Sequence, residues 1–432
     1  MPDASPGKPD IPAVPANFAP DTMSVPSRST TIRFGAGFLV FGISWAVGLA
    51  IVANVLLPQR LTDIGVSSPE AWLGTINAVT AVVSLLANLV FGSLSDRSRS
   101  RFGRRSPWLL CGGIIGGLSL FAVGLLDNAA AIMVTYCITM IGLNMMLAPA
   151  VAVMSDRVPA NVRGTMSAFF GGGATIGFPL GAVIGAAFIT KTVSGFALGA
   201  VLMAVAGTLT LFIWPRERSA REAAPVTGGL RDLLTSFRPP APRSAPDFYK
   251  AFAGRLFMLI SYQMIAAYQL YIVQNYIGQS KTESAATISA MSLITLVVGL
   301  VASLGSGPVS DRIGRRKAPA AIAAALFAIG VAMPWISPTT TGMFLYAAIA
   351  GFGYGVFSSV DQAINIDVLP NPDQAGKDLG VLNLATTLGQ TIGPIITSAV
   401  AVSTGSYGLI FPVSIGMAVI GAVAVLRIGS VR

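Results

Sequence analysis

Of the 432 residues in the chain, 53% are hydrophobic and only 11% are charged, and the mean hydropathy is +0.71. A soluble fold of this length could not bury so much apolar surface, so the composition indicates a protein that crosses a membrane many times. The formal charge of +10 fits arginine gathered on cytoplasmic loops, so we expect the lipid bilayer, and no nucleic acid, as a partner.

The residue types that the chain lacks exclude several kinds of chemistry. It contains no histidine, which excludes histidine-based catalysis and histidine metal ligands. No cluster of Cys, Asp and Glu has metal spacing, and there is no nucleotide-binding loop. Cys111 and Cys137 both lie in apolar runs, where we expect small buried hydrophobic side chains. We therefore expect neither an enzyme nor a metal or cofactor.

Apolar segments of about 20 residues, the length of a membrane-spanning helix, occur twelve times along the chain. They lie near residues 34–57, 72–95, 107–126, 129–154, 165–190, 195–214, 251–277, 285–309, 318–336, 342–366, 379–402 and 406–427. The sequence thus predicts an all-α polytopic membrane protein with two bundles of six helices, at 34–214 and 251–432. Residues 1–33 are expected to form a disordered tail, and the polar segment 215–250 a linker.

The charge of the connecting segments predicts the orientation. All Lys and Arg residues except Arg60, Lys191 and Lys281 fall in the tail, in the loops on the same side as the tail, at the start of the segment 251–277, in the linker or at the C-terminus. Short loops with such a bias face the cytoplasm. We expect a multi-pass protein of the plasma or inner membrane, with both termini cytoplasmic.

Two loops are duplicated between the halves. GSLSDRSRSRFGRRSPW at Gly92–Trp108 has a shorter copy, GSGPVSDRIGRRK, at Gly305–Lys317. Similarly, DRVP from Asp156 matches DVLP from Asp367 at nearly the same distance along the chain. Two matched loops at a similar offset indicate tandem six-helix repeats.

These loops carry a resemblance to a known family. The twelve spans, the repeat and the pattern G-x-x-S-D-R-x-G-R-R-K, which ends at Lys317, resemble the major facilitator superfamily. The longer first copy, SDRSRSRFGRRSPW, is similar to the loop of sucrose transporters and of the glycoside–pentoside–hexuronide cation symporters. The resemblance implies a secondary transporter that works by alternating access.

The duplicated loops are candidate gates. A carboxylate at the end of a helix can cap the next turn or pair with a nearby arginine, and the resemblance implies that such pairs form in one state and break in the other. The candidate gating residues are Asp96, Arg97, Gly103, Arg104, Arg105, Asp311, Arg312, Gly314, Arg315 and Arg316.

Polar side chains within the apolar segments are candidates for substrate binding. Tyr, Asn and Gln offer donors and acceptors that suit sugar hydroxyls, and aromatic rings can pack on the apolar face of a sugar. The candidates are Trp45, Asn54, Asn144, Tyr268, Tyr271, Gln274, Asn383 and Gln390. The alternative is that some of these residues anchor helix ends or join neighbouring helices.

Asp361 is the only acid well inside a predicted span. Acidic residues in a membrane segment are functional by default, so Asp361 is the candidate for carrying a coupling ion. The alternative is a structural ion pair with an arginine of the second loop, Arg315 or Arg316.

The sequence therefore predicts a transporter of a small molecule, and we expect a proton-coupled symporter of a sugar or glycoside that works as a monomer. Sodium is less favoured, because the N-terminal half has no acid within its spans. A proton-coupled drug exporter is an alternative, since Gly173, Gly177, Pro179 and Gly181 resemble a motif of drug/proton antiporters, although such spacing also serves helix packing. An uncoupled facilitator is the other alternative.

Overall fold

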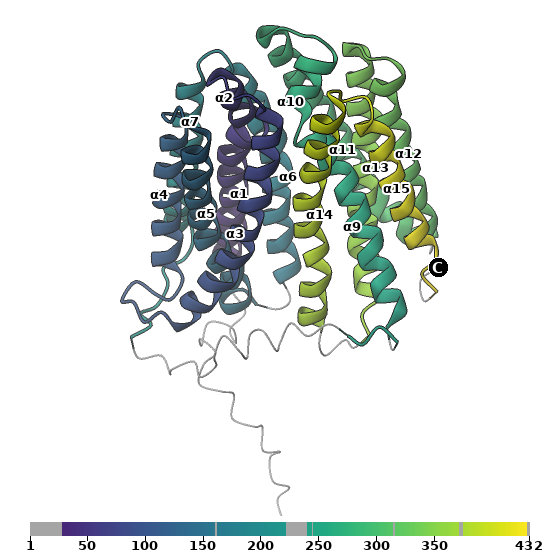
Figure 1. Cartoon of the computed structure of the whole chain (residues 1–432). Coiled ribbons are helices and arrows are strands. Elements are labelled where there is room, and N and C mark those ends of the chain that lie inside the picture. Colours follow the sequence, from purple (N-terminus) through teal and green to yellow (C-terminus); the bar gives the residue numbers. More distant parts are fainter. Residues whose placement is uncertain are drawn as a thin grey trace, which may run out of the picture.

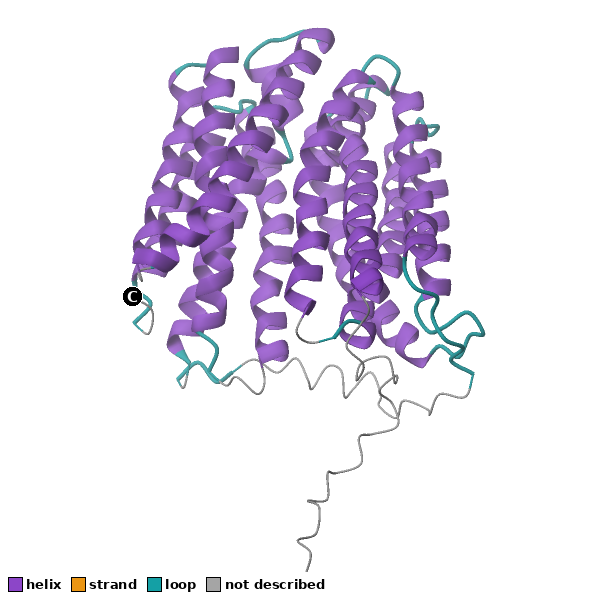
Figure 2. Ribbon diagram, turned by 180° about the vertical axis from the view of Figure 1, so that it is seen from behind, coloured by secondary structure: helices purple, strands orange, loops and turns teal. Residues whose placement is uncertain are grey.

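The computed structural model describes residues 28–159, 162–221, 240–243, 245–313, 316–370 and 375–429. In these residues the regular structure is helical, and the long helices run back and forth between two ends of the molecule (Figures 1 and 2). The described part contains no strand and a single isolated bridge, between Ser100 and Gly103. The all-α prediction is confirmed.

The first half comprises α1 (Arg28–Ile51), the π-helical turn η2 (Val52–Leu56), α2 (Leu57–Asp63), α3 (Pro69–Arg97), α4 (Ser106–Val123), α5 (Ala129–Arg157), α6 (Arg163–Ala187) and α7 (Thr192–Ile213). The second half comprises α9 (Pro246–Ala266), α10 (Gln269–Tyr271), the π-helical turn η4 (Ile272–Tyr276), α11 (Lys281–Ile313), α12 (Lys317–Ile336), α13 (Thr340–Asp367), α14 (Ala375–Thr404) and α15 (Ile410–Leu426).

These helices account for every predicted span. Within the described residues, ten helices are long and apolar enough to cross a membrane, with α1, η2 and α2 counted as one. An eleventh span is formed by α9 together with α10 and η4, which are bent by 48° relative to α9. The shorter apolar helix α15, of 17 residues, lies at the twelfth predicted position.

Two helices begin earlier than the sequence suggested. α1 starts at Arg28, so residues 28–33 are helical and do not belong to a tail; the rest of the expected tail, residues 1–27, lies outside the described residues. Arg33 explains the longer helix, because its guanidinium donates to the carbonyls of Ile213 (2.8 Å) and Trp214 (3.1 Å) at the end of α7. α9 starts at Pro246, a residue favoured in the first turn of a helix.

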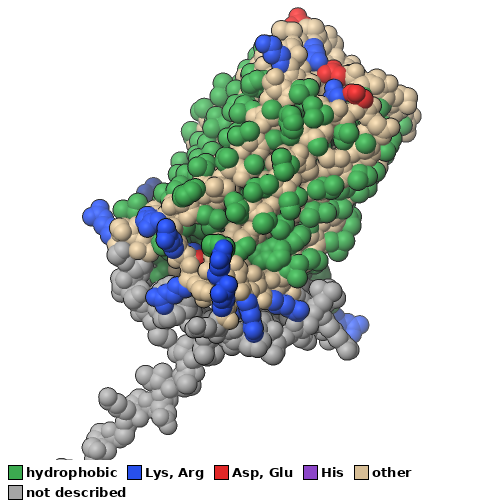
Figure 3. Space-filling view, turned by 90° about the vertical axis from the view of Figure 1, so that its left-hand side faces the viewer, with side chains coloured by type: hydrophobic (Ala, Val, Ile, Leu, Met, Phe, Trp, Pro, Cys, Tyr) green, Lys and Arg blue, Asp and Glu red, His purple; other side chains and the backbone are tan. Residues whose placement is uncertain are grey.

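The two halves lie side by side (Figure 1), and they touch mainly where α6 meets α11 and where α3 meets α14. We call the end that holds the turn 98–105 the arginine-loop end, and the end that holds α2 and α10 the opposite end. Figure 3 shows Lys and Arg gathered at the arginine-loop end, a broad apolar belt, and a smaller mixed group of charges at the opposite end. This distribution is the one expected for a protein that spans a bilayer.

Glycines let the helices of each half approach backbone to backbone. A Cβ added to Gly173 of α6 would lie 2.7 Å from the Leu39 carbonyl of α1, and one added to Gly177 would lie 2.8 Å from the Ala46 Cβ. One added to Gly181 would lie 2.6 Å from the Ala50 Cβ. Close packing between α1 and α6 therefore accounts for the spacing of these glycines.

This packing predicts opposite effects at two neighbouring glycines. We expect Gly173→Ala to lower the unfolding temperature in detergent, because crowding a packed core costs about 1–3 kcal/mol. Gly172→Ala is the matched control, since a Cβ there meets nothing within 4 Å and alanine favours the helix by up to about 1 kcal/mol. Equal melting temperatures for the two variants would contradict the backbone contact.

Candidate functional site

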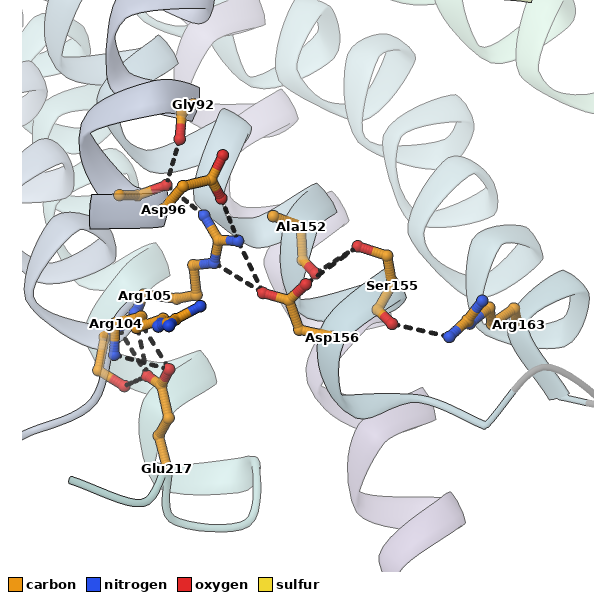
Figure 4. A network of polar contacts seen from close by, with 11 residues as sticks. Gly92, Asp96, Arg104, Arg105, Ala152, Ser155, Asp156, Arg163 and Glu217 are labelled. Carbon is orange, nitrogen blue, oxygen red and sulfur yellow. Dashed lines mark hydrogen bonds and ion pairs between the residues drawn. The ribbon is translucent and has the colours of Figure 1, made fainter. Parts of the chain in front are cut away.

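At the arginine-loop end, Arg105 joins two helices of the first half (Figure 4). Its guanidinium pairs with Asp96 of α3, donates to Asp156 of α5 through Nε (2.9 Å) and Nη2 (2.7 Å), and also donates to Ser95. Arg105 is 4% exposed. Although burial alone lowers the pKa of Arg105, the charges of Asp156 and Asp96 outweigh it and raise that pKa above its ordinary value. Of the two roles that the sequence leaves open for Asp96, capping a turn or pairing with a nearby arginine, the structure shows the pairing, and Asp156 is a second acid on the same arginine.

Glu217, just after α7, caps the helix that follows this arginine. Its carboxylate accepts hydrogen bonds from the backbone N–H groups of Arg104 (2.8 Å), Arg105 (3.1 Å) and Ser106 (3.0 Å), and from the Ser106 hydroxyl (2.7 Å). The start of the expected linker is therefore attached to the arginine loop (Figure 4). Gly103 has φ +100°, and a Cβ there would collide with the Glu217 side chain, so the turn requires glycine.

The second half repeats one part of this arrangement. Arg316 donates to Asp367 (2.6 Å) and to the carbonyl of Ala363 (3.0 Å), as Arg105 donates to Asp156 in the first half. The other predicted gating residues are located as follows. Arg97 is in the last turn of α3, Arg312 is exposed in the last turn of α11, Asp311 is in α11 with its side chain outside the description, and Gly314 and Arg315 lie outside the described residues.

At the opposite end, side chains of the second half bind the first half directly. The hydroxyls of Tyr268 and Tyr271 donate to the carbonyls of Glu70 and Pro58, both at 2.9 Å. The Gln274 amide donates to Gln59 (2.9 Å). In this conformation the three substrate candidates Tyr268, Tyr271 and Gln274 therefore hold the halves together.

Four further contacts complete this closure. Asn275 and Tyr407 donate to the Glu70 carboxylate at 3.1 and 2.9 Å, and Ser398 donates to the Glu70 carbonyl at 3.2 Å. The Lys281 ammonium pairs with Asp63 (2.9 Å). These contacts between the halves, all among residues that the structure describes, lie together at this end.

The remaining substrate candidates have different surroundings. Asn144 accepts from Asn88 (3.2 Å) and donates to the Met140 carbonyl (2.9 Å), which joins α3 to α5. Trp45 is half-buried against Phe178, with ring centroids 5.5 Å apart. Asn54 is half-buried in the π-helical turn η2.

Asn383 and Gln390 form an exposed polar face on α14. The large apolar side chains exposed on the same helix are Leu388, Ile395 and Val402. At 3.6 residues per turn, this apolar stripe lies about 100° or more around the axis from the two amides. The amides therefore do not share the face that suits lipid.

Asp361 pairs with Arg255. Both residues are buried, and the Arg255 Nη1 lies 3.3 Å from the Asp361 Oδ2. Asn365 donates to the same Asp361 oxygen (3.1 Å), and the Arg255 Nε donates to Thr386 (3.1 Å). Of the two arginines expected as its partner, Arg316 instead binds Asp367, in the last turn of α13, at 2.6 Å, and Arg315 lies outside the described residues.

Comparison with known proteins identifies the family. A family model described as MFS/sugar transport protein matches residues 34–410, most of the chain. The chain belongs to this family. It is therefore a multi-pass membrane transporter of the major facilitator superfamily and not an enzyme, as the sequence predicted.

Curated relatives match shorter segments of this transporter. It is 31% identical over 108 residues to the general alpha-glucoside permease of Schizosaccharomyces pombe, which is 24% of this chain and 18% of the permease. It is 36% identical over 98 residues to an uncharacterized symporter of Synechocystis, which is 22% of this chain and 15% of the symporter. The matched segments thus span less than a fifth of either relative.

Solved structures share the fold of the transporter. The nucleoside transporter NupG aligns with a TM-score of 0.72 at 15% identity, over 91% of this chain and 98% of NupG. A bacterial homolog of the human lysosomal transporter Spinster, inward-facing and unoccupied, aligns with a TM-score of 0.63 at 14% identity, over 94% and 95% of the two chains. Identities this low show a shared fold alone.

Sequence reasoning missed three functional candidates: Glu70, Glu217 and Arg255. Arg255 was the one with a readable signal, since it is the only basic residue inside the predicted span 251–277, and a buried cation requires a counter-ion. Glu70 and Glu217 are single acids near helix ends, which sequence alone does not distinguish from ordinary solvent-exposed charges.

The capping role of Glu217 gives a testable expectation. Glu217→Ala leaves the first N–H groups of α4 without their acceptor, so we expect a loss of about 1–2 kcal/mol of stability. The measurement is the melting temperature of the purified protein. Glu217→Gln, which keeps one acceptor oxygen, should lose less; if both variants melted like the wild type, the cap would contribute nothing.

Proposed function

We propose that this protein is a secondary transporter that moves a sugar or glycoside across the membrane by alternating access, with protons as the coupling ion. The observation that carries the proposal is the closure at the opposite end, where Tyr268, Tyr271 and Glu70 belong to a set of contacts between the halves. Each half is tightly packed internally, so rocking of one half against the other would break these contacts and leave the bundles intact.

The orientation is part of the proposal. With the arginine-loop end in the cytoplasm, as the positive-inside rule favours, both termini are cytoplasmic and the closed end faces outward. The protein would reside in the plasma or inner membrane and act as a monomer, since each chain contains both halves.

The uncharged polar groups support a neutral, hydroxyl-rich substrate. Asn383 and Gln390 offer amide donors and acceptors on an exposed face of α14. Aromatic rings are available at the Tyr262–Tyr354 stack, with centroids 4.0 Å apart, and at Trp45. Amides and aromatic faces together suit sugars, and the similarity to an alpha-glucoside permease points the same way.

The arginine-loop network supports a gating role. Arg105 is held by Asp96 and Asp156 on two helices of one half. In a state closed at this end, Asp96 or Arg105 could exchange a partner in this network for one on the other half. We extend the proposed gating role to the other candidates of the two duplicated loops because they occupy equivalent positions. These candidates are Arg97, Gly103, Arg104, Asp311, Arg312, Gly314, Arg315 and Arg316.

A counterflow assay tests the proposed function. The purified protein is reconstituted in liposomes loaded with one unlabelled sugar, and the entry of the same labelled sugar is followed for α-glucosides, pentoses, polyols and a cationic dye. We expect exchange of an α-glucoside or related glycoside. Exchange of the dye alone would favour the drug exporter. The glycines of α6 do not support that alternative separately, because helix packing already accounts for their spacing.

Asp361 is the proposed proton carrier, and its pairing with Arg255 shapes the experiment. Asp361→Asn alone leaves a buried, unmatched arginine, a loss that costs about 3–5 kcal/mol for such pairs. The double variant Asp361→Asn with Arg255→Gln removes both charges and should recover stability. We expect the double variant to exchange substrate yet lose accumulation driven by a pH gradient.

The outcome separates coupling from structure. Proton-driven accumulation at the wild-type level in the double variant would remove Asp361 from the coupling mechanism. Exchange without any gradient-driven accumulation in the wild type itself would indicate an uncoupled facilitator.

A further inference from the structure

Most of the side-chain contacts found between the two halves share one direction. In the hydrogen bonds between the halves given above, the donor belongs to the second half and the acceptor to the first. The donors are Tyr268, Tyr271, Gln274, Asn275, Lys281, Ser398 and Tyr407, and the acceptors are Pro58, Gln59, Asp63 and Glu70.

Most of these contacts converge on Glu70, in the first turn of α3. Its carbonyl accepts from Tyr268 (2.9 Å) and Ser398 (3.2 Å), and its carboxylate accepts from Asn275 (3.1 Å) and Tyr407 (2.9 Å). The donors come from the bend between α9 and α10, from η4, from α14 and from the segment before α15. A single residue of the first half thus meets four separate parts of the second.

The backbone around Glu70 is shaped for this approach. A Cβ on Gly74, one turn further along α3, would lie 2.5 Å from the Ser398 Cβ and 3.0 Å from the Tyr268 hydroxyl. Any larger residue at this position would push α3 away from α14. Gly74 therefore lets both donors reach the Glu70 carbonyl.

We propose that Glu70 is the latch that keeps the opposite end closed and sets how often that end opens. The proposal rests on the transport function above, because a latch has meaning only if the halves move. Hydrogen bonds to a carboxylate are stronger than those between neutral groups. The Lys281–Asp63 pair lies at the surface, with side chains 36% and 27% exposed, and exposed ion pairs contribute little.

The same geometry makes the latch reversible. Glu70 is half-buried, and no Lys or Arg in the described part of the chain forms an ion pair with it. When the halves separate, water replaces the Tyr407 and Asn275 donors, and no buried charge is left without a partner. Opening therefore exchanges protein hydrogen bonds for hydration, at a modest cost.

The rate at which a cysteine below the latch is labelled measures how often the opposite end opens. Gln263 of α9 is half-buried and lies deeper than Tyr268 as seen from the opposite end. Gln263→Cys is placed in a background with Cys111→Ala and Cys137→Ala, and a membrane-impermeant maleimide is added to one side of sealed vesicles at a time. From the opposite end, the reagent reaches position 263 only when the latch is open.

We expect Glu70→Ala to raise the labelling rate from the opposite end by fivefold or more, since losing even one net hydrogen bond changes such an equilibrium about fivefold. Labelling from the arginine-loop end should not rise. Tyr407→Phe should give a smaller increase, and Glu70→Gln, which keeps an acceptor oxygen, should lie below Glu70→Ala.

Tyr249→Phe is the matched control, because it removes a tyrosine–carbonyl bond of 2.7 Å between α9 and Pro240, in the segment that precedes α9. It should leave labelling unchanged. A folded Glu70→Ala protein labelled at the wild-type rate would overturn the proposal. So would a rise from both ends, which indicates general loosening.

The labelling assay separates this proposal from the proposed function. It requires no substrate, so a latch effect without glycoside counterflow would retain the latch and reject the substrate class. Glycoside counterflow in the wild type together with unchanged labelling in Glu70→Ala would support the proposed substrate class and reject the latch.

Discussion

A polar group inside a bilayer has no water to bind, and this constraint decides where the chain places its polar side chains. Several such groups within the helices are paired with one another. Ser261 and Ser414 exchange hydroxyl-to-carbonyl bonds of 2.6 and 3.0 Å, and Arg255 neutralises Asp361. Polar contacts between the halves lie where the helices end, because only there can the groups return to water when the contacts break.

Packing within each half follows from the same setting. Lipid tails are as apolar as leucine, so helices in a membrane associate through close contact and not through the hydrophobic effect. Gly42 of α1 faces Gly173 of α6, and Gly112 of α4 faces Gly142 of α5, so closely that a Cβ on either glycine would collide with the backbone of the facing helix. Such contacts do not slide easily, so in the proposed mechanism each half would move as one body while the polar contacts at the opposite end break.

The sequence predicts the spans and the two halves, because hydropathy, charge bias and duplicated loops are all local signals. It names Asp96 and Arg105 as gating candidates but does not specify which acid and arginine pair. It does not predict the partner of Asp361. Arg255 precedes Asp361 by a hundred residues, and only the arrangement of α9, α13 and α14 brings them together. Tyr268 and Tyr271 stand out in the sequence as polar side chains in an apolar segment. Their contacts with the first half depend on tertiary structure, which the sequence does not reveal.

The repeat is retained within each half more clearly than between the halves. The halves keep related features, with a π-helical turn at Val52–Leu56 and another at Ile272–Tyr276, and an Arg–Asp pair at the arginine-loop end of each. Those pairs form within a half, so both copies can be kept. A two-fold interface could also repeat its contacts, since residue i would meet residue j and j would meet i. The Glu70 contacts instead join a carboxylate of the first half to Tyr407 and Asn275 of the second, so the two rims have diverged in sequence where they meet.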